Sequence, residues 1–214
     1  MKIKLCGFTD KESIKFALKY EPDFMGFIFY PPSKRNINLK QAREFANINF
    51  GKTKKIAVIV NGNDVDITQI IENLKPDFLQ LHGEESLDRC LEIKRRFSLP
   101  IIKSIAIFED LKISKILEKV RQYQNIADFL LFDSKTKEKG GSGKVFDWEI
   151  LKKLNLKKDY FLSGGLDINN IAEAKKISGA KIFYLSSGIE EKKGVKSLEK
   201  IKNLMELFNE LKKA

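Results

Sequence analysis

Apolar and polar positions follow two alternating patterns along this chain, and together they predict its elements. In the first pattern, short and nearly continuous apolar runs are bounded by polar or glycine positions, which is typical of strands buried on both faces. These runs cover residues 3–6, 24–29, 55–60, 78–81, 101–105, 128–132, 160–163 and 181–185. In the second pattern, apolar residues recur at three- and four-residue spacing, as in Ile67, Ile70, Ile71 and Leu74, which predicts amphipathic helices between the strands.

The number and spacing of these units predict the architecture. Eight strands, each followed by a helix or a turn, fill 214 residues at about 27 residues per unit, which suits a compact βα repeat. Eight such units close into a parallel barrel, so we predict an α/β fold, a single-domain (βα)8 TIM barrel. A doubly wound open sheet is the alternative that periodicity leaves open. Because no Pro/Gly-rich linker divides the chain, residues 1–214 are expected to form one domain.

Composition narrows the choice of partners. Hydrophobic residues make up 43% and charged residues 32% of the chain, which is ordinary for a globular protein with a sizeable core. Lys+Arg total 40 against 29 Asp+Glu, and the formal net charge of +11 would suit either a nucleic-acid binder or an anionic small substrate. The lysines are spread over the whole chain rather than gathered in a stripe, so we expect no nucleic-acid partner.

The cysteines and the apolar runs bear on location. Cys6 and Cys90 lie far apart and in no metal-ligand spacing, which favours a reducing cytoplasm over a disulfide framework or a metal site. No apolar run approaches the ~18 residues needed to span a bilayer, and the N-terminus begins directly with a strand. We therefore expect a soluble, cytoplasmic protein with no membrane partner, acting as a monomer or a homodimer.

Polar residues with useful chemistry lie at the ends of the predicted strands, where α/β barrels place their active sites. Cys6 ends the first strand and Asp133 follows the sixth; a thiol and a carboxylate there can act as general base and general acid. The only histidine, His82, follows the fourth strand, and Arg35 lies in the loop after the second. Taken alone, Cys6 could equally be a small buried hydrophobe and Asp133 a loop cap. As a pair they indicate an isomerase.

Glycines after the last two predicted strands indicate an anion site. Gly164 and Gly165 follow the seventh strand, and Ser187 and Gly188 follow the eighth, where a short helical turn is expected. Glycine lets a ligand oxygen approach the main chain, and amides at the start of a helix bind phosphate. Since the loops after strands seven and eight are the usual phosphate site of a barrel, we expect a phosphorylated small-molecule substrate.

A second glycine-rich run, residues 140–144, does not have the pattern of a nucleotide P-loop. Glu138 stands where the first glycine is required, and Val145 follows the lysine in place of Ser or Thr. We interpret residues 134–144 as a loop near the site, with Phe146 and Trp148 anchoring its far end.

Several motifs in chain order carry a resemblance to a known family: Cys6-Gly7, Pro31-Pro32-Ser33-x-Arg35, Gln80-Leu81-His82-Gly83, Asp133 and Gly164-Gly165. With them the chain resembles the phosphoribosylanthranilate isomerases, tryptophan-pathway enzymes built on a (βα)8 barrel, over essentially its whole length. The resemblance implies an Amadori rearrangement of N-(5-phosphoribosyl)anthranilate to 1-(2-carboxyphenylamino)-1-deoxyribulose 5-phosphate, with no cofactor and no metal.

The resemblance also implies a role for each site residue. Cys6 would be the general base that removes the proton from sugar C2, and Asp133 the general acid that protonates the ring oxygen. Arg35 would hold the anthranilate carboxylate, and His82 is a further candidate for contact with the substrate. The phosphate would be bound by the backbone around Gly164, Gly165, Ser187 and Gly188.

The chain departs from the family pattern at Tyr184, at Ala106 and along residues 193–197, and two other functions remain as alternatives. Tyr184 stands on the eighth strand where the family usually has an aspartate, and Ala106 follows the fifth strand where a basic residue is common. One alternative is another phosphate-binding barrel enzyme of amino-acid biosynthesis, against which the thiol of Cys6 argues, because two carboxylates or a lysine with glutamates would be expected there. The other is the nucleic-acid binder that the charge suggests.

Overall fold

The structure is a computed structural model that describes residues 1–108, 112–135, 146–156 and 158–213. Its principal strands are β1 (Lys2–Cys6), β2 (Phe24–Phe29), β3 (Lys54–Ile59), β4 (Phe78–Leu81), β5 (Ile101–Phe108), β6 (Phe129–Lys135), β7 (Tyr160–Leu162) and β8 (Ile182–Leu185). Its helices are α1 (Lys11–Leu18), α2 (Leu39–Ala46), α3 (Asp64–Leu74), α4 (Leu87–Phe97), α5 (Ile113–Tyr123), α6 (Glu149–Lys153), α7 (Ile171–Ser178) and α8 (Leu198–Lys213). A 3-10 turn, η1 (Ser187–Ile189), and a small sheet of β9 (Glu190–Lys192) and β10 (Val195–Lys196) lie between β8 and α8.

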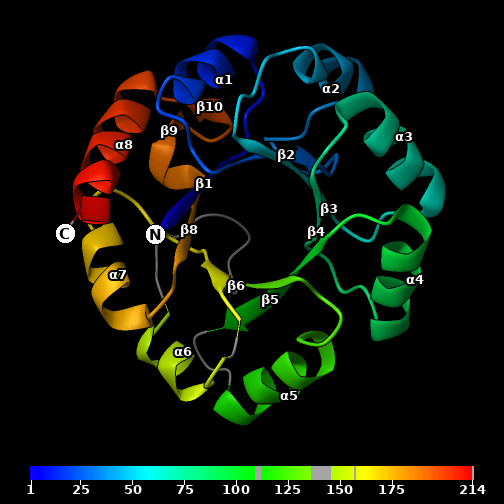
Figure 1. Cartoon of the computed structure of the whole chain (residues 1–214), viewed down its shortest axis with the longest axis vertical. Helices are drawn as coiled ribbons and strands as arrows, with labels where there is room; N and C mark the ends of the chain where they lie inside the picture. The colour runs from blue at the N-terminus through cyan, green and yellow to red at the C-terminus, as the bar shows by residue number, and fades with distance from the viewer. Residues whose placement is uncertain (109–111, 136–145, 157, 214) are drawn as a thin grey trace.

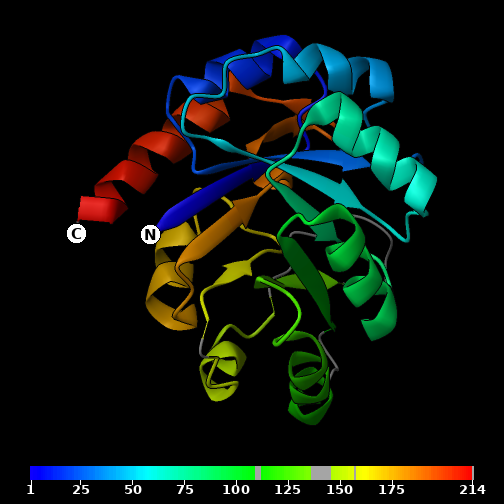
Figure 2. The ribbon, with the colours of Figure 1, turned by 45° about the vertical axis from the view of Figure 1, so that its right-hand side comes forward.

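The eight strands pair in chain order, all parallel, and β8 pairs with β1 to close the barrel. Figure 1 looks into this barrel and shows the helices as an outer ring, and Figure 2 shows the same layers from a second direction. The predicted TIM barrel is confirmed, and the doubly wound open sheet is wrong. Every predicted strand is present, although β5 and β6 run three residues beyond their predicted ends, to Phe108 and Lys135.

Alternation along each strand divides the buried side chains into two cores. On β1, Ile3 and Leu5 point outward into the layer between strands and helices, whereas Cys6 belongs to the cluster inside the barrel. Neighbouring side chains of a strand point to opposite faces, so Lys4 shares the inward face with Cys6. The inner cluster also contains Tyr184 of β8, which is paired with Lys4 in the register of the two strands.

A ring of four phenylalanines fills the interior near the strand starts. Ring centroids are 5.8 Å apart for Phe24 and Phe78, 6.1 Å for Phe78 and Phe129, 5.6 Å for Phe129 and Phe161, and 5.3 Å for Phe161 and Phe24. The tilted and edge-on contacts are those that aromatic quadrupoles favour. This ring closes the amino end of the barrel, so any site must lie at the carboxyl end.

Local sequence explains where the first helices begin. Asp10, Asn38, Asn63 and Ser86 precede α1 to α4, and each side chain accepts a hydrogen bond from the amide three residues on. These residues satisfy amide groups that have no partner within the helix. The first turns therefore start immediately after the strand-end loops, and this keeps those loops short.

Two sequence expectations concern the segment that follows β6. Phe146 and Trp148, which were predicted to anchor the far end of a loop, are both buried in the outer core. The glycine-rich run 140–144 lies outside the described residues. The loop after β7 turns at Asp167, whose amide donates to Asn170 Oδ1 and whose carboxylate accepts from the amide of Asn169, and α7 begins at Ile171. No helix in the described part of the chain combines the length and apolar character needed to cross a bilayer.

Candidate active site

Cys6 lies at the last position of β1, inside the carboxyl end of the barrel, and its side chain has no exposed surface. The space for its sulfur comes from Gly26 on β2, because a Cβ atom added there would lie 2.3 Å from Cys6 Sγ. The Ser186 hydroxyl donates a hydrogen bond of 3.1 Å to the Cys6 carbonyl and ties the end of β8 to β1. The predicted base is therefore held by strand geometry rather than by a loop.

Asp133 lies on β6 two residues before the strand ends, and its side chain is part-exposed. His82, just past the end of β4, brings its Nε2 to 3.3 Å from Asp133 Oδ2. The other ring nitrogen, Nδ1, is 2.9 Å from the amide nitrogen of Gln80. His82 is thus fixed on both sides, and one of those contacts is the carboxylate predicted to be the acid.

Lys4 is a buried charged residue on the strand of the predicted base, and the sequence interpretation did not include it. It is fully buried, its ammonium donates to Gln80 Oε1, and it lies 4.2 Å from the centroid of the Tyr184 ring. Burial lowers the pKa of Lys4 to about 8, although the charges of Cys6 and Asp133 work to raise it. The charge of Lys4 therefore interacts with both predicted catalytic groups.

Arg35 is held by a carboxylate that the sequence analysis did not assign to the site. Its Nε and Nη2 donate to the two oxygens of Glu190 at 2.6 and 2.7 Å, and Lys196 Nζ donates to the same carboxylate at 2.9 Å. Burial works to raise the pKa of Glu190, but the hydrogen bond from Arg35 and the charge of Lys196 outweigh it and lower that pKa. The Arg35 chain passes over Gly7, whose added Cβ would lie 2.7 Å from Arg35 Cδ.

The predicted phosphate loops pack directly against each other. A Cβ atom on Gly188 would lie 2.2 Å from the carbonyl oxygen of Leu166, in the loop after β7. Gly164, at φ +93°, would in the same way meet the backbone nitrogen of Ser134 at 2.3 Å. The expected short turn is confirmed as η1, and the amides of Ser187 and Gly188 open it, so they have no acceptor inside the turn.

One pocket touches both of these loops. It has a volume of about 320 Å³ and is lined by Gly165, Ser187, Gly188, Asn203 and Lys200, among others. Lys200, on the first turn of α8, also donates to the Glu190 carbonyl at 2.8 Å. The structure therefore brings the glycines after β7 and β8 together and sets a lysine beside them.

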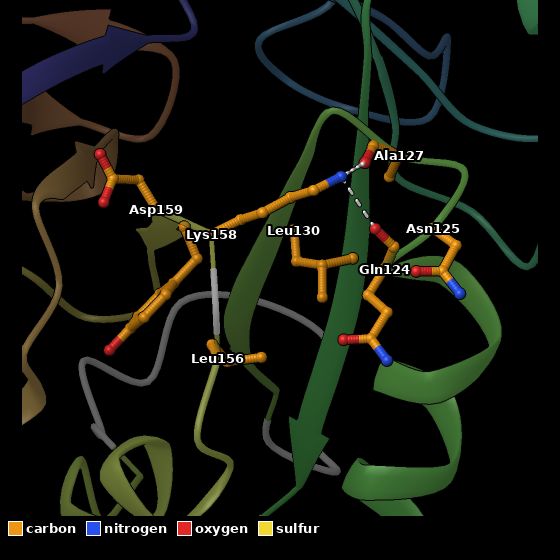
Figure 3. A pocket seen from close by; sticks show the side chains of 8 residues that line it. Gln124, Asn125, Ala127, Leu130, Leu156, Lys158 and Asp159 are labelled. Carbon is orange, nitrogen blue, oxygen red and sulfur yellow. Dashed lines mark hydrogen bonds between the residues drawn. The ribbon is translucent and has the colours of Figure 1, made fainter.

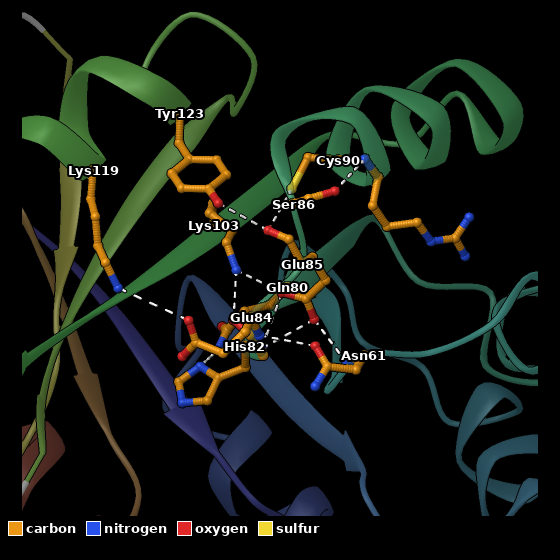
Figure 4. A network of polar contacts seen from close by, with 12 residues as sticks. Asn61, Gln80, His82, Glu84, Glu85, Ser86, Cys90, Lys103, Lys119 and Tyr123 are labelled. Carbon is orange, nitrogen blue, oxygen red and sulfur yellow. Dashed lines mark hydrogen bonds and ion pairs between the residues drawn. The ribbon is translucent and has the colours of Figure 1, made fainter.

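Behind His82, a buried ion pair joins the loops after β3 and β4 to strand β5 (Figure 4). Lys103 Nζ of β5 donates to Glu85 Oε2 at 2.6 Å, and both side chains are nearly inaccessible. The Glu85 carboxylate accepts from the amide of Asn61 after β3, at 2.9 Å, and from the amide of Gly83 after β4, at 3.1 Å. Burial works to raise the pKa of Glu85, but Lys103 outweighs it and lowers that pKa. This cluster shapes the loop that presents His82.

A separate pocket of about 110 Å³ lies at the opposite end of the barrel (Figure 3). It is lined by Leu130, near the start of β6, by Tyr160, the first residue of β7, and by Lys158, which donates to the carbonyls of Gln124 and Ala127. It contains none of the predicted site residues. Among the described residues, no cluster of three or more His, Cys, Asp or Glu side chains could hold a metal ion.

The structure thus gathers the predicted residues in two groups. Cys6, Asp133 and His82 lie with Arg35 around the carboxyl end of the barrel, and the four loop residues predicted for phosphate lie together after β7 and β8. Lys4, Gln80, Glu190 and Lys196 were missed. For Lys4 and Gln80 a signal existed, since each sits two residues before a predicted site residue and shares its face.

Comparison with known proteins agrees with this geometry. The family model described as N-(5'-phosphoribosyl)anthranilate (PRA) isomerase matches residues 3–207. The chain belongs to this family. The N-(5'-phosphoribosyl)anthranilate isomerase of Bradyrhizobium sp. (strain ORS 278) is 38% identical over 207 residues, which cover 95% of this chain and 93% of that relative.

Solved structures place the barrel in the same family. The crystal structure of phosphoribosyl anthranilate isomerase from Thermotoga maritima superposes with a TM-score of 0.85 at 31% identity, covering 96% of this chain and 97% of that one. A second isomerase structure, in complex with reduced 1-(o-carboxyphenylamino)-1-deoxyribulose 5-phosphate, superposes with a TM-score of 0.82 at 26% identity, covering 96% and 97%. The family named by these matches is the one that the sequence motifs predicted.

Proposed function

We propose that Cys6 and Asp133 are the general base and the general acid of the isomerase reaction. The protein is an isomerase of tryptophan biosynthesis that converts N-(5'-phosphoribosyl)anthranilate to 1-(2-carboxyphenylamino)-1-deoxyribulose 5-phosphate. The observation that carries the assignment is that the two groups interact with the same pair of buried side chains. Both Cys6 and Asp133 interact with the ammonium of Lys4 and with the phenol of Tyr184, from strands β1 and β6.

The reaction needs one proton delivered and one removed. In its protonated form, Asp133 gives a proton to the furanose oxygen, the ring C–O bond breaks, and the nitrogen lone pair forms the C1–N double bond. Cys6 in its thiolate form then takes the proton from C2, and the C–H electrons return toward nitrogen to give the enolamine. Ketonisation of this enolamine yields the aminoketose. Two groups held in different protonation states are what such an acid–base sequence requires.

The surrounding cations support the orientation of the substrate. Arg35 is proposed to hold the anthranilate carboxylate. It is fixed by hydrogen bonds to Glu190 and interacts with the charge of Cys6. His82, beside Asp133, is proposed to contact the substrate at the acid. Cys6 has no accessible surface, so a substrate that reaches its sulfur must move the side chains above it.

The phosphate is proposed to bind the backbone around Gly164, Gly165, Ser187 and Gly188. The support is the contact between the two loops, the amides that open η1, and the shared pocket that contains Lys200. Glycine at these positions lets the main chain approach an anion closely. A phosphorylated substrate therefore has its anionic end placed after β7 and β8 and its sugar toward Cys6.

Three further properties belong to the same proposal. Residues 1–214 are proposed to form one catalytic domain, which works in the cytoplasm as a monomer or a homodimer without a nucleic-acid or membrane partner. Support for the compartment comes from the two cysteines, which are both free and buried. Sedimentation velocity gives the number of subunits.

The decisive test compares Cys6→Ala and Asp133→Asn with the wild-type enzyme. Substrate is generated in situ, and turnover is followed by the decay of anthranilate fluorescence. Each variant is expected to lose a factor of about 10² to 10⁴ in kcat/KM, the usual contribution of a positioned acid or base. Cys90→Ala is the matched control, because Cys90 is the other buried cysteine and lies on α4, outside the site. Near-normal turnover by both site variants, with unchanged circular dichroism, would sink the proposed roles.

A further inference from the structure

Tyr184 lies directly beside the proposed base, at a position for which no role has been assigned. It is on β8, paired in register with Lys4 on β1, and its side chain is buried inside the barrel. Tyr184 and Cys6 belong to the same buried cluster inside the barrel, and the Tyr184 ring lies 4.2 Å from the Lys4 ammonium. A phenol, a thiol and an ammonium are therefore stacked in one layer under the carboxyl end of the barrel.

The burial of Tyr184 sets its protonation. Burial raises the pKa of Tyr184 well above its usual value, and the charge of Cys6 and the hydrogen bond to it act in the same direction. The phenol therefore stays neutral and can donate its proton to the sulfur throughout the working pH range. A neutral donor favours the thiolate over the thiol, because the charged sulfur is the stronger acceptor.

Lys4 supplies a positive charge to the same layer. Because its pKa is about 8, Lys4 is mostly protonated at pH 7, and its contact with the Tyr184 face and with Gln80 fixes its place. The thiolate of Cys6 favours the ammonium form of Lys4, and such coupling is reciprocal, so the ammonium favours the thiolate.

We propose that Tyr184 is a positioning residue for the base: its hydroxyl holds the Cys6 sulfur as a thiolate, and Lys4 across its ring stabilises that charge. This inference rests on the proposed role of Cys6. It assigns to Tyr184 and Lys4 a part in the reaction that both play through the sulfur.

Other titratable groups also face this layer. Asp133 from β6 interacts with both Tyr184 and Lys4, Arg35 interacts with Tyr184 and Cys6, and Lys196 interacts with Cys6. His82 reaches the layer through Asp133. All of these groups remain in place when the Tyr184 hydroxyl alone is deleted, so a change in the pH behaviour of Cys6 reports on that hydroxyl.

The test is Tyr184→Phe, which removes one oxygen and keeps the ring over Lys4. Thiolate formation is followed by absorbance at 240 nm between pH 5 and 9.5, as a difference from Cys6→Ser. Cys90, whose pKa burial raises to about 11, stays silent in that range. The midpoint for Cys6 is expected to move up by about one pH unit, which corresponds to a 10-fold loss of thiolate at neutral pH.

Tyr160→Phe is the matched control. Tyr160 is also 8% exposed, and it donates its hydroxyl to the Ser178 carbonyl on the outer side of β7. Its loss should cost stability without moving the Cys6 midpoint. Tyr184→Phe should lose about 10-fold in kcat/KM at neutral pH, because less of Cys6 is then thiolate. At high pH the thiolate forms without the hydroxyl, so kcat/KM should recover toward the wild-type value.

Lys4→Met provides a second and independent variant. It removes the charge while keeping an unbranched chain in the barrel, and the Cys6 midpoint should again move up. Unmoved midpoints in both variants, or a loss of turnover equal at every pH, would overturn the inference. The absorbance titration needs no substrate, so it decides the role of Tyr184 even if the wild-type protein showed no isomerase activity, an outcome that would instead contradict the proposed function.

Discussion

At the residue scale, Gly26 leaves the space that the proposed base occupies, because it has no side chain. Its place on β2 faces both Lys4 and Cys6, and an added Cβ would lie 2.9 Å from Lys4 Cε and 2.3 Å from Cys6 Sγ. The flexible lysine chain can yield by small rotations, but the short cysteine side chain on a paired strand has few alternatives. Gly26 therefore determines where the sulfur of the base can lie.

We predict that Gly26→Ala lowers kcat/KM by about 10-fold to 100-fold, because a shift of about 1 Å in a catalytic group can cost that much. The measurement is the anthranilate fluorescence decay, with urea unfolding to follow stability. Gly51→Ala is the control, since an added Cβ at Gly51 would meet nothing within 4 Å. Full activity in Gly26→Ala would mean that the sulfur has more freedom than the strands allow.

The sequence analysis singled out residues at the predicted strand ends and passed over those in the middle of strands. Cys6 and Asp133 were chosen because a thiol ends one predicted strand and a carboxylate follows another, at the places where barrels put their chemistry. Lys4 and Gln80 stand within such runs, where charge and amide groups look like surface positions until the direction of each side chain is known. Glu190 was missed for another reason: its partners Arg35 and Lys196 come from distant segments, and no local pattern joins them.

At the element scale, Glu85 holds together the loops that follow β3 and β4. Its carboxylate accepts from the amides of Asn61 and Gly83 and pairs with Lys103 on β5, and it is nearly inaccessible to water. Removing one partner of a buried ion pair leaves the other charge without compensation, which is more costly than the pair was worth. This carboxylate therefore contributes to holding the loop that carries His82.

We predict that Glu85→Gln lowers the free energy of unfolding by about 3 kcal/mol. Equilibrium urea unfolding at pH 7 measures it, and the matched control is Glu84→Gln, since Glu84 is the adjacent residue and is exposed. The variant should also weaken substrate binding, seen as a higher KM, because His82 loses its support. An effect no larger than that of Glu84→Gln would show that the backbone alone holds these loops.

Strong periodicity made the barrel elements predictable, while short polar elements were not. Each of the eight strands was found because helices cover it and its apolar run is continuous. The sheet of β9 and β10 was missed because Glu190–Lys192 and Val195–Lys196 are short and largely polar. The ends of β5 and β6 were placed too early, because Ala106 and Asp133 interrupt the pattern of branched residues while the two strands continue to pair.

At the scale of the whole molecule, buried carboxylates link stability to pH. The pKa values of Glu85 and Glu190 are lowered in the folded protein, against a reference of ~4.3 in the unfolded chain. Between the unfolded and the folded pKa, the unfolded state binds more protons, so stability falls as the pH falls. Their contribution is complete above about pH 5 and is lost progressively below pH 4.

We predict that the free energy of unfolding changes little between pH 7 and pH 5.5 and then decreases as the pH falls below about 4.5, because both groups keep pKa values below their unfolded one and the unfolded chain takes up protons first. Urea titrations across this range give the slope. In the double variant Glu85→Gln with Glu190→Gln the decrease should be shallower. A slope equal to that of the wild type would show that other carboxylates control acid unfolding.

The ring of four phenylalanines leaves the barrel interior open at one end only. Each of Phe24, Phe78, Phe129 and Phe161 contacts its two neighbours in the ring, and together they fill the amino end of the interior. The opening at the carboxyl ends of the strands is then the route for substrate, product, water and exchanged protons. Substrate entry and product release therefore alternate. A bound product blocks entry of the next substrate, so the rate of product release sets an upper limit on turnover.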